Sequence, residues 1–255
     1  MNLVARNVDF RVAQHQILQG VSADFPTGQV SALIGPNGAG KSTLLRLLAA
    51  DQSPTGGEIL VEQKSLFKMS LSERARLRAV MTQSSQVVFD FTVAEIVEFG
   101  WHGRQTDKEI ALQEVIHACA LLPLLDRKFN TLSGGEQQRV QFARALLQIW
   151  LPPGTTMARF LLLDEPTASL DVAHELQVLN MAHQAASQGV GVIVVLHDLN
   201  LASRFADQLI LLHNGQVVQT GPPQEVLADT ILSEVYATPL RVEHHRELDR
   251  LIIYS

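Results

Sequence analysis

The chain has 255 residues, and its 20 Lys and Arg against 26 Asp and Glu give a formal net charge of −6. Hydrophobic residues make up 46% of the composition, which excludes a disordered chain because so many apolar side chains can bury a core. At about 150 residues per domain, this length predicts one large domain or a core with a subdomain. The acidic balance, without runs of Lys and Arg, argues against a protein whose main task is to bind nucleic acid.

No targeting or membrane-spanning segment is expected. The best candidate for a membrane span, Val190–Leu196, has the length of a strand rather than the ~18 residues that a membrane helix needs. The N-terminus lacks a basic stretch followed by an apolar one, so no signal peptide is predicted. Cys119 is the one cysteine, which fits a reducing compartment. We therefore expect a soluble cytosolic protein.

Taken in chain order, short apolar stretches alternate with stretches of helical periodicity, which is typical of a parallel sheet covered by helices. Pro26-Thr27-Gly28 is predicted to be a turn between two N-terminal strands, which suggests an antiparallel portion there. Asn214-Gly215 predicts a hairpin near the C-terminus, because both residues accept positive φ angles. The expected strands are Leu3–Phe10, Ile17–Phe25, Val30–Ile34, Ala79–Thr82, Phe160–Leu163, Val192–Leu196, Gln208–Leu212 and Gln216–Gln219.

Residues 86–148 differ from the rest, because they show helical periodicity and almost no strand pattern. Thr92 and Glu95 form a capping box that predicts a helix over Val93–Phe99. We expect an α/β fold in which a helical subdomain, residues 86–150, is inserted into a core formed by residues 1–85 and 151–255.

A predicted phosphate-binding loop of the pattern G-x-x-x-x-G-K-S follows the apolar strand Val30–Ile34 and precedes a helical stretch. Its glycines let successive backbone N–H groups face one anion at a positive helix N-terminus. Lys41 would contact the β- and γ-phosphates, and the Ser42 hydroxyl would coordinate Mg²⁺. The core is thus predicted to be a P-loop NTPase with a mixed sheet. The predicted ATP-binding residues are Gly35, Pro36, Asn37, Gly38, Ala39, Gly40, Lys41, Ser42 and Thr43.

Two further segments complete a pattern that spans nearly the whole chain. Residues 132–139 read LSGGEQQR, and residues 160–165 read FLLLDE. Together with the phosphate loop, and in this order, these segments resemble the ATP-binding cassette (ABC) family of ATPases. The LSGGEQQR segment is very specific, and the resemblance implies ATP hydrolysis.

The signature segment, residues 132–139, also has chemistry of its own. Ser133 and Glu136 form a capping box, so a helix is predicted to start there. Two glycines cost about 1 kcal/mol each relative to alanine in a helix, which argues for a role beyond capping. The resemblance implies that Ser133, Gly134, Gly135 and Glu136 contact ATP held by a second subunit. It therefore implies a head-to-tail homodimer with two composite sites.

The apolar strand Phe160–Leu163 ends in two carboxylates, at the sheet edge where ligands of open α/β folds gather. The resemblance implies that Asp164 holds Mg²⁺ beside Ser42, and that Glu165 is the general base that polarises the attacking water. Adjacent strand side chains point to opposite faces, so the two carboxylates can do the same job only if the chain bends at Pro166.

Other residues match the family pattern individually. By resemblance, Gln83 senses the metal and the γ-phosphate, His197 bonds the γ-phosphate, and Ser169 and Asp171 belong to a loop that crosses the dimer interface. Phe10 lies where the family usually has a tyrosine that stacks on adenine, and phenylalanine keeps the π-face. A core position for Phe10 is the alternative.

The family includes transporter motors, chromosome and repair ATPases, and translation or assembly factors. The absence of a long coiled coil and of a second cassette favours a transporter motor. Such a motor would act with two copies of a membrane permease, and indirectly with a periplasmic binding protein, at the cytoplasmic face of the inner membrane. A soluble ABC-type ATPase that remodels a protein or nucleoprotein complex is the alternative.

Two stretches of the sequence bear on which cargo the transporter would carry. Val80–Gln83 and His197–Ala202 resemble bacterial importers of iron chelates, hemin and cobalamin. The stretch from Arg144 to Asp164 is longer than in a typical cassette and resembles the hemin-importer ATPases in particular, because it contains Trp150, Pro152, Pro153 and Gly154. Hemin is therefore the expected cargo, with a ferric siderophore or cobalamin as alternatives. The pair His244-His245 reads as a solvated strand edge or turn, so no heme site is predicted.

Residues 84–92 join Gln83 to the predicted helical subdomain, and their apolar residues follow no clear period. The resemblance implies a groove here that receives a short cytoplasmic helix of the permease, with Phe89 as an aromatic anchor. The alternative is that Val87, Val88, Phe89 and Phe91 form the small core of the helical subdomain.

Overall fold

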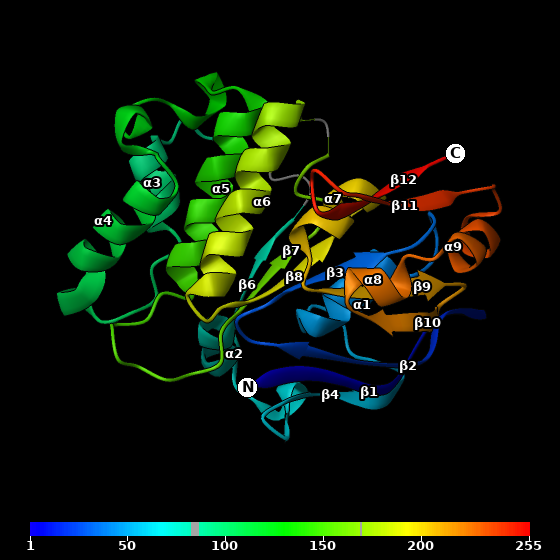
Figure 1. The fold of residues 1–255 in the computed structure, drawn as a ribbon. Coiled ribbons are helices and arrows are strands. Elements are labelled where there is room, and N and C mark those ends of the chain that lie inside the picture. Colours follow the sequence, from blue (N-terminus) through cyan, green and yellow to red (C-terminus); the bar gives the residue numbers. More distant parts are fainter. Residues whose placement is uncertain (83–86, 169) are drawn as a thin grey trace.

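The computed structural model describes residues 1–82, 87–168 and 170–255. It contains a six-stranded sheet, a smaller antiparallel sheet and a group of helices beside them (Figure 1). The expectations for Gln83 and Ser169 concern positions outside the described residues.

The larger sheet has the strand order β10-β9-β3-β8-β7-β6, and its neighbouring strands are parallel except for β9 and β10. Every residue of β3, β7 and β8 is buried, as expected for parallel strands covered on both faces. The loops after these three strands therefore meet at one edge of the sheet. The strands are β3 (Val30–Ile34), β6 (Arg78–Met81), β7 (Phe160–Leu163), β8 (Gly191–Val195), β9 (Gln208–His213) and β10 (Gln216–Gly221).

The smaller sheet has the order β2-β1-β4-β5 and is antiparallel throughout. Its buried residues, such as Leu3 and Phe25, pack with Leu44 of α1 in one hydrophobic cluster. A separate two-stranded hairpin lies near the C-terminus. These strands are β1 (Asn2–Val12), β2 (His15–Pro26), β4 (Gly56–Val61), β5 (Lys64–Ser65), β11 (Arg241–His245) and β12 (Arg250–Tyr254).

The helices α3, α4 and α5 fall between β6 and β7, and α6 runs beside α5 (Figure 1). One buried cluster joins Val97 and Ala111 of the helical region to Leu161 and Val192 of the sheet, so both parts share a core. Among the described residues, no helix has the length and apolar character needed to cross a membrane. The helices are α1 (Lys41–Leu48), α2 (Leu71–Leu77), α3 (Val93–Glu98), α4 (Lys108–Ala118), α5 (Gly134–Gln148), α6 (Val172–Ser187), α7 (Leu199–Phe205), α8 (Pro223–Val226) and α9 (Asp229–Tyr236).

Both predicted capping boxes are confirmed. Thr92 with Glu95 opens α3, and Ser133 with Glu136 opens α5, each with reciprocal side-chain-to-backbone hydrogen bonds. The same arrangement opens α2. In each box the carboxylate and the hydroxyl satisfy N–H groups that a helix start leaves without partners.

All eight predicted strands are present, with ends shifted by two residues or fewer. The hairpin at Asn214-Gly215 is also confirmed, with φ angles of 48° and 75°. The interpretation of Pro26-Thr27-Gly28 is wrong in one respect: this turn leads from β2 in the small sheet to β3 in the large one. The antiparallel partner of β2 is β1 instead.

Candidate active site

The phosphate loop connects β3 to α1, and glycine is required at both of its ends. At Gly35, where φ is 141°, a Cβ would lie 2.1 Å from the carbonyl oxygen of Leu212 in β9. At Gly40, where φ is 99°, a Cβ would lie 2.5 Å from a methyl carbon of Leu18 in β2. The loop is therefore held between the two sheets.

The turn between β9 and β10 supports the same loop. The backbone N–H of Gly215 donates to the carbonyl of Ala39 at 3.2 Å, and Gln19 N–H donates to the carbonyl of Gly215 at 2.8 Å. The hairpin turn predicted at Asn214-Gly215 thus contacts the phosphate loop. This tertiary role could not be read from the sequence.

Lys41, the first residue of α1, is 5% exposed and points back over the loop. Its ammonium donates to the carbonyl oxygens of Gly35 at 2.7 Å and Pro36 at 3.0 Å. An ammonium has three N–H donors, so one remains for a phosphate oxygen. Burial lowers the pKa of Lys41, while the carboxylates of Glu165 and Asp164 oppose this shift. The lysine and both predicted carboxylates are therefore within electrostatic range of one another.

The two carboxylates after β7 have different surroundings. Asp164 continues the pairing of β7 with β6, since its N–H donates to the carbonyl of Met81 at 2.9 Å. Its Oδ1 is buried and has no hydrogen-bond partner within the described residues. The bend occurs at Glu165 itself, which has a φ of 49°. A left-handed non-glycine residue costs about 1–3 kcal/mol, and such strain is often found at functional sites.

This bend brings Glu165 to the end of β8. Its Oε1 lies 2.6 Å from Nε2 of His197, the residue predicted to contact the γ-phosphate. The glutamate side chain is 21% exposed and the histidine side chain is 45% exposed, so both are accessible from solvent. The structure thus joins the predicted base and the predicted switch histidine directly.

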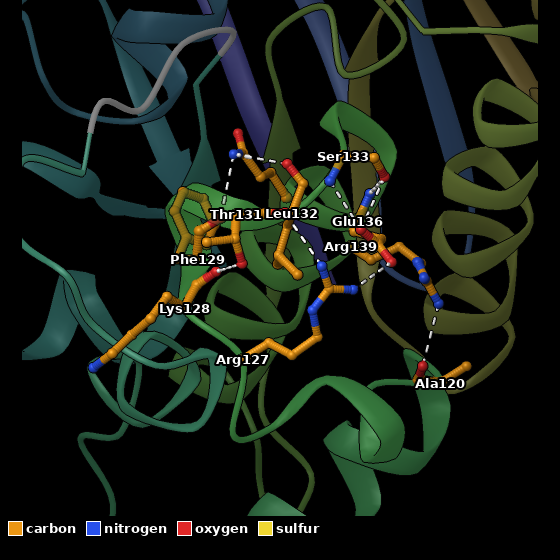
Figure 2. A network of polar contacts seen from close by, with 10 residues as sticks. Ala120, Arg127, Lys128, Phe129, Thr131, Leu132, Ser133, Glu136 and Arg139 are labelled. Carbon is orange, nitrogen blue, oxygen red and sulfur yellow. Dashed lines mark hydrogen bonds and ion pairs between the residues drawn. The ribbon is translucent and has the colours of Figure 1, made fainter.

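A network of polar contacts holds the start of the signature helix α5 (Figure 2). Ser133 N–H donates to Glu136 Oε2 at 2.8 Å, and the Ser133 hydroxyl donates to the same oxygen at 3.0 Å. Arg127 lies 3.5 Å from the other carboxylate oxygen and donates to the carbonyl of Thr131 at 3.2 Å. The pKa of Glu136 is lowered, chiefly by the hydrogen bond from the Ser133 backbone.

Sequence reasoning missed three members of this network. Gln137 donates to the carbonyls of Phe129 and Leu132, both at 3.3 Å, and Arg139 donates to the carbonyl of Ala120 at 3.2 Å. These residues belong to the LSGGEQQR segment, which was the available signal for them. Arg127 precedes the segment and carried no signal.

The predicted dimer loop, residues 169–171, is described at Leu170 and Asp171, and Asp171 caps α6. Its carboxylate accepts a hydrogen bond from the backbone N–H of His174 at 3.0 Å. Phe10 is 9% exposed and belongs to the core of the small sheet, as the alternative interpretation expected, and stacking on adenine stays a prediction. Val12, at the end of β1, is 52% exposed.

The segment before α3 divides into buried and exposed residues. Val87 and Phe91 pack against the main core, whereas Val88 is 82% exposed and Phe89 is 70% exposed. Phe91 contacts Phe89 and Phe99 edge-on, at centroid distances of 6.0 and 5.0 Å. The alternative of a core role thus holds for Val87 and Phe91 but not for Val88 or Phe89.

The long connection between α5 and β7 lines a pocket of about 430 Å³ together with the loop after α3. Trp150 contacts Trp101 there at a centroid distance of 6.0 Å, and its Nε1–H donates to Glu114 at 2.6 Å. The histidine pair lies on β11, where His244 is 3.2 Å from Asp249 and His245 accepts from Leu248 N–H at 3.3 Å. Both histidines are exposed.

A phosphate loop at the end of β3, a histidine after the neighbouring strand β8 and an acidic pair after the next strand, β7, define a P-loop nucleotide hydrolase. A family model described as "ABC transporter" matches residues 18–168. The chain belongs to this family, and it is an ABC-type ATPase that binds ATP.

Individual relatives agree with this assignment. The chain is 43% identical to the hemin import ATP-binding protein HmuV of Roseobacter denitrificans over 246 residues, which cover 95% of this chain and 93% of the relative. A metal-chelate type ABC transporter solved in an inward-facing conformation is 25% identical, with a TM-score of 0.79, and covers 100% of this chain and 98% of that one. A bacterial ABC transporter cassette solved as a dimer is 27% identical, with a TM-score of 0.71. The match covers 87% of this chain and 98% of that cassette.

Proposed function

We propose that this chain is the ATP-hydrolysing subunit of a bacterial ABC importer, and that it supplies energy for hemin uptake through a separate membrane permease. The name of the relative in Roseobacter denitrificans supports hemin as the cargo. The long connection that contains Trp150 supports the same choice among iron chelates. A soluble remodelling ATPase is not favoured, because the relative that covers 95% of the chain carries an importer name.

The contact between Glu165 and His197 carries the hydrolytic part of the proposal, with 2.6 Å between Oε1 and Nε2. Glu165 accepts a proton from the attacking water, whose oxygen bonds to the γ-phosphorus as the bond to the β–γ bridging oxygen breaks. His197 orients the carboxylate and contacts the γ-phosphate. Lys41 and the backbone N–H groups of the phosphate loop bind the β- and γ-phosphates.

The residues at this edge fit Mg²⁺, which prefers a few carboxylate and hydroxyl oxygens in addition to phosphate and water. Asp164 offers a buried carboxylate oxygen with no partner in the described part of the chain. Ser42 lies in the first turn of α1, beside Lys41. When bound, Mg²⁺ neutralises charge that develops on the phosphates. Gln83 is proposed as a further contact of the metal.

Two subunits would form composite sites, with Ser133, Gly134, Gly135 and Glu136 of one chain facing ATP on the other. The dimeric cassette among the solved structures supports this arrangement. ATP should then promote dimerisation, since a ligand that binds only the dimer shifts the equilibrium by mass action. Replacing Ser133 with Arg should abolish ATP-dependent dimerisation in size-exclusion chromatography, because the larger side chain crowds the phosphate. Full hydrolysis by a strictly monomeric preparation would contradict composite sites.

The proposed assembly contains the ATPase dimer and two permease copies, at the cytoplasmic face of the inner membrane, with a periplasmic binding protein that delivers cargo. Residues 86–150 would act as the helical subdomain that contacts the permease. The test is ATP-driven uptake into proteoliposomes that contain the ATPase, a hemin permease and its binding protein. We expect uptake of hemin, and little uptake of a ferric siderophore or cobalamin. Uptake of another chelate in place of hemin would overturn the assignment of hemin as the cargo.

A further inference from the structure

The first turn of α6 carries a histidine that lies directly against the signature segment. The ring of His174 fills the space where a side chain at Gly135 would begin, since a Cβ there would lie 2.0 Å from Cδ2 and 2.3 Å from Cγ. Real Cβ contacts do not come closer than 3.0 Å. Glycine at position 135 is therefore required by the close approach of α5 and α6, which run side by side (Figure 1).

His174 is fixed from its other side by Asp171 of the dimer loop. The Asp171 carboxylate accepts from the His174 backbone N–H at 3.0 Å and lies 2.8 Å from the ring Nδ1. An ionised carboxylate can only accept, so Nδ1 carries the proton. The hydrogen bonds that Asp171 accepts from His174, chiefly the one from its backbone N–H, lower the pKa of the Asp171 carboxyl.

The residue before Asp171 also approaches the signature segment. A Cβ at Gly134 would lie 4.0 Å from Cδ2 of Leu170, so the dimer loop also reaches the other signature glycine. The pKa of Glu175, in the same turn as His174, is raised by burial and by the charges of Asp198 and Asp171. The start of α6 and Leu170 thus lie against the signature segment.

We propose that His174 is a positioning residue for ATP hydrolysis, because it ties the dimer loop to the signature segment of the same chain. This inference rests on the proposed dimer, in which both segments face the partner subunit. A fixed link makes the two segments approach the partner together. Without the ring, each subunit still binds ATP, but the segments move independently, so closure of the dimer becomes less favourable.

The test compares His174→Ala with His183→Ala, which removes an exposed histidine from the same helix. Both changes are made in the full chain with and without Glu165→Gln, which slows hydrolysis so that an ATP-bound dimer accumulates. Sedimentation velocity measures ATP-dependent dimerisation, and titration of dilute monomer measures ATP affinity. We expect His174→Ala to weaken dimerisation at least tenfold and to leave the ATP affinity of the monomer within twofold. In the chain that retains Glu165, kcat should fall more than KM changes.

The outcomes separate this proposal from the proposed function. A Glu165→Gln chain that stays monomeric with ATP overturns both. Normal ATP-dependent dimerisation by His174→Ala overturns only the role of His174, as does an equal loss in His183→Ala.

A second measurement tests the contact within one chain. Gly135→Ala should lower the thermal unfolding temperature in the wild-type background, because the new methyl group collides with the ring, and should lower it much less in the His174→Ala background. Equal losses in the two backgrounds would show that the ring does not occupy this space in solution, and would overturn the inference.

Discussion

At the scale of single residues, the chemistry of the site depends on the backbone of Glu165. Its left-handed conformation, with φ of 49°, turns the side chain away from the strand direction and toward His197. Asp164 keeps the strand direction and points to a buried position instead. The two adjacent carboxylates therefore have different surroundings, since Asp164 pairs with β6 and has a buried carboxylate oxygen, whereas Glu165 lies next to His197.

Glu165→Gln should reduce steady-state hydrolysis by about 10²–10⁴-fold, which is the usual contribution of a general base. The amide cannot accept the proton of the attacking water, but it retains the size of the carboxylate, so ATP binding should persist. Phosphate release measures the rate of hydrolysis, and equilibrium titration measures ATP binding. Glu247→Gln, an exposed carboxylate on the C-terminal hairpin turn, is the control and should not change the rate. A rate within threefold of wild type would remove Glu165 from this role.

His197→Ala should also slow hydrolysis, because the Glu165 carboxylate then loses the group that lies 2.6 Å away. Residues in one hydrogen-bonded unit have effects that do not add, so the double variant with Glu165→Gln should be little slower than Glu165→Gln alone. Single-turnover rates of the four proteins check this. Fully multiplicative losses would indicate that the two residues act independently.

At the scale of elements, the helix starts are held by carboxylates. Glu73, Glu95 and Glu136 accept hydrogen bonds at the starts of α2, α3 and α5, and these bonds lower the pKa of each side chain from 4.5. The unfolded chain lacks these hydrogen bonds. Each carboxylate therefore binds a proton more readily in the unfolded state than in the folded state.

The free energy of unfolding should therefore fall as the pH is lowered. These groups stabilise the fold fully above their unfolded pKa, near 4.5, and the contribution is lost as pH falls through the lower pKa of the folded state. Urea unfolding at a series of pH values from about 7 to about 3 should show this loss. Glu95→Gln should make the dependence shallower, because an amide does not titrate. An unchanged dependence would mean that this cap is not formed in solution.

At the scale of the whole molecule, the exposed aromatic surface beside α3 needs an explanation. Val88, Phe89 and Phe99 are each more than half exposed, although they lie next to a buried core. Exposed apolar groups of this kind commonly mark contacts with other proteins. The proposed permease contact accounts for this surface, since a few aromatic anchors supply most of the affinity when a helix binds a groove.

Phe89→Asp should therefore uncouple the ATPase from transport without unfolding it. Basal hydrolysis and the unfolding temperature should match wild type, because the side chain is 70% exposed, while transport by the reconstituted complex should be lost. Leu122→Asp, which changes a 73% exposed leucine after α4, controls for the added charge. Normal transport by Phe89→Asp would contradict the permease contact, and loss of basal hydrolysis would indicate a structural role.

Features encoded by adjacent or regularly spaced residues could be predicted from the sequence. The strand Val30–Ile34, the phosphate loop after it and the capping boxes at Thr92 and Ser133 are of this kind, because each depends on local backbone geometry or on hydrogen bonds within one turn. Strand β4 was missed because its first two residues are glycines, which weaken a strand pattern. The hairpin β11–β12 was missed because most of its strand residues are polar or exposed.

The sequence by itself determined the class of chemistry, since the order of phosphate loop, signature segment and acidic pair depends only on the chain. Tertiary structure alone decided which of these residues touch. The contacts of Glu165 with His197 and of Gly135 with His174 join segments that belong to different elements. Tertiary packing likewise buried Phe10 and left Phe89 exposed, although both are phenylalanines in predicted functional positions. The physical reason is that burial depends on which surfaces meet when the sheets and helices pack, and a local pattern does not specify that.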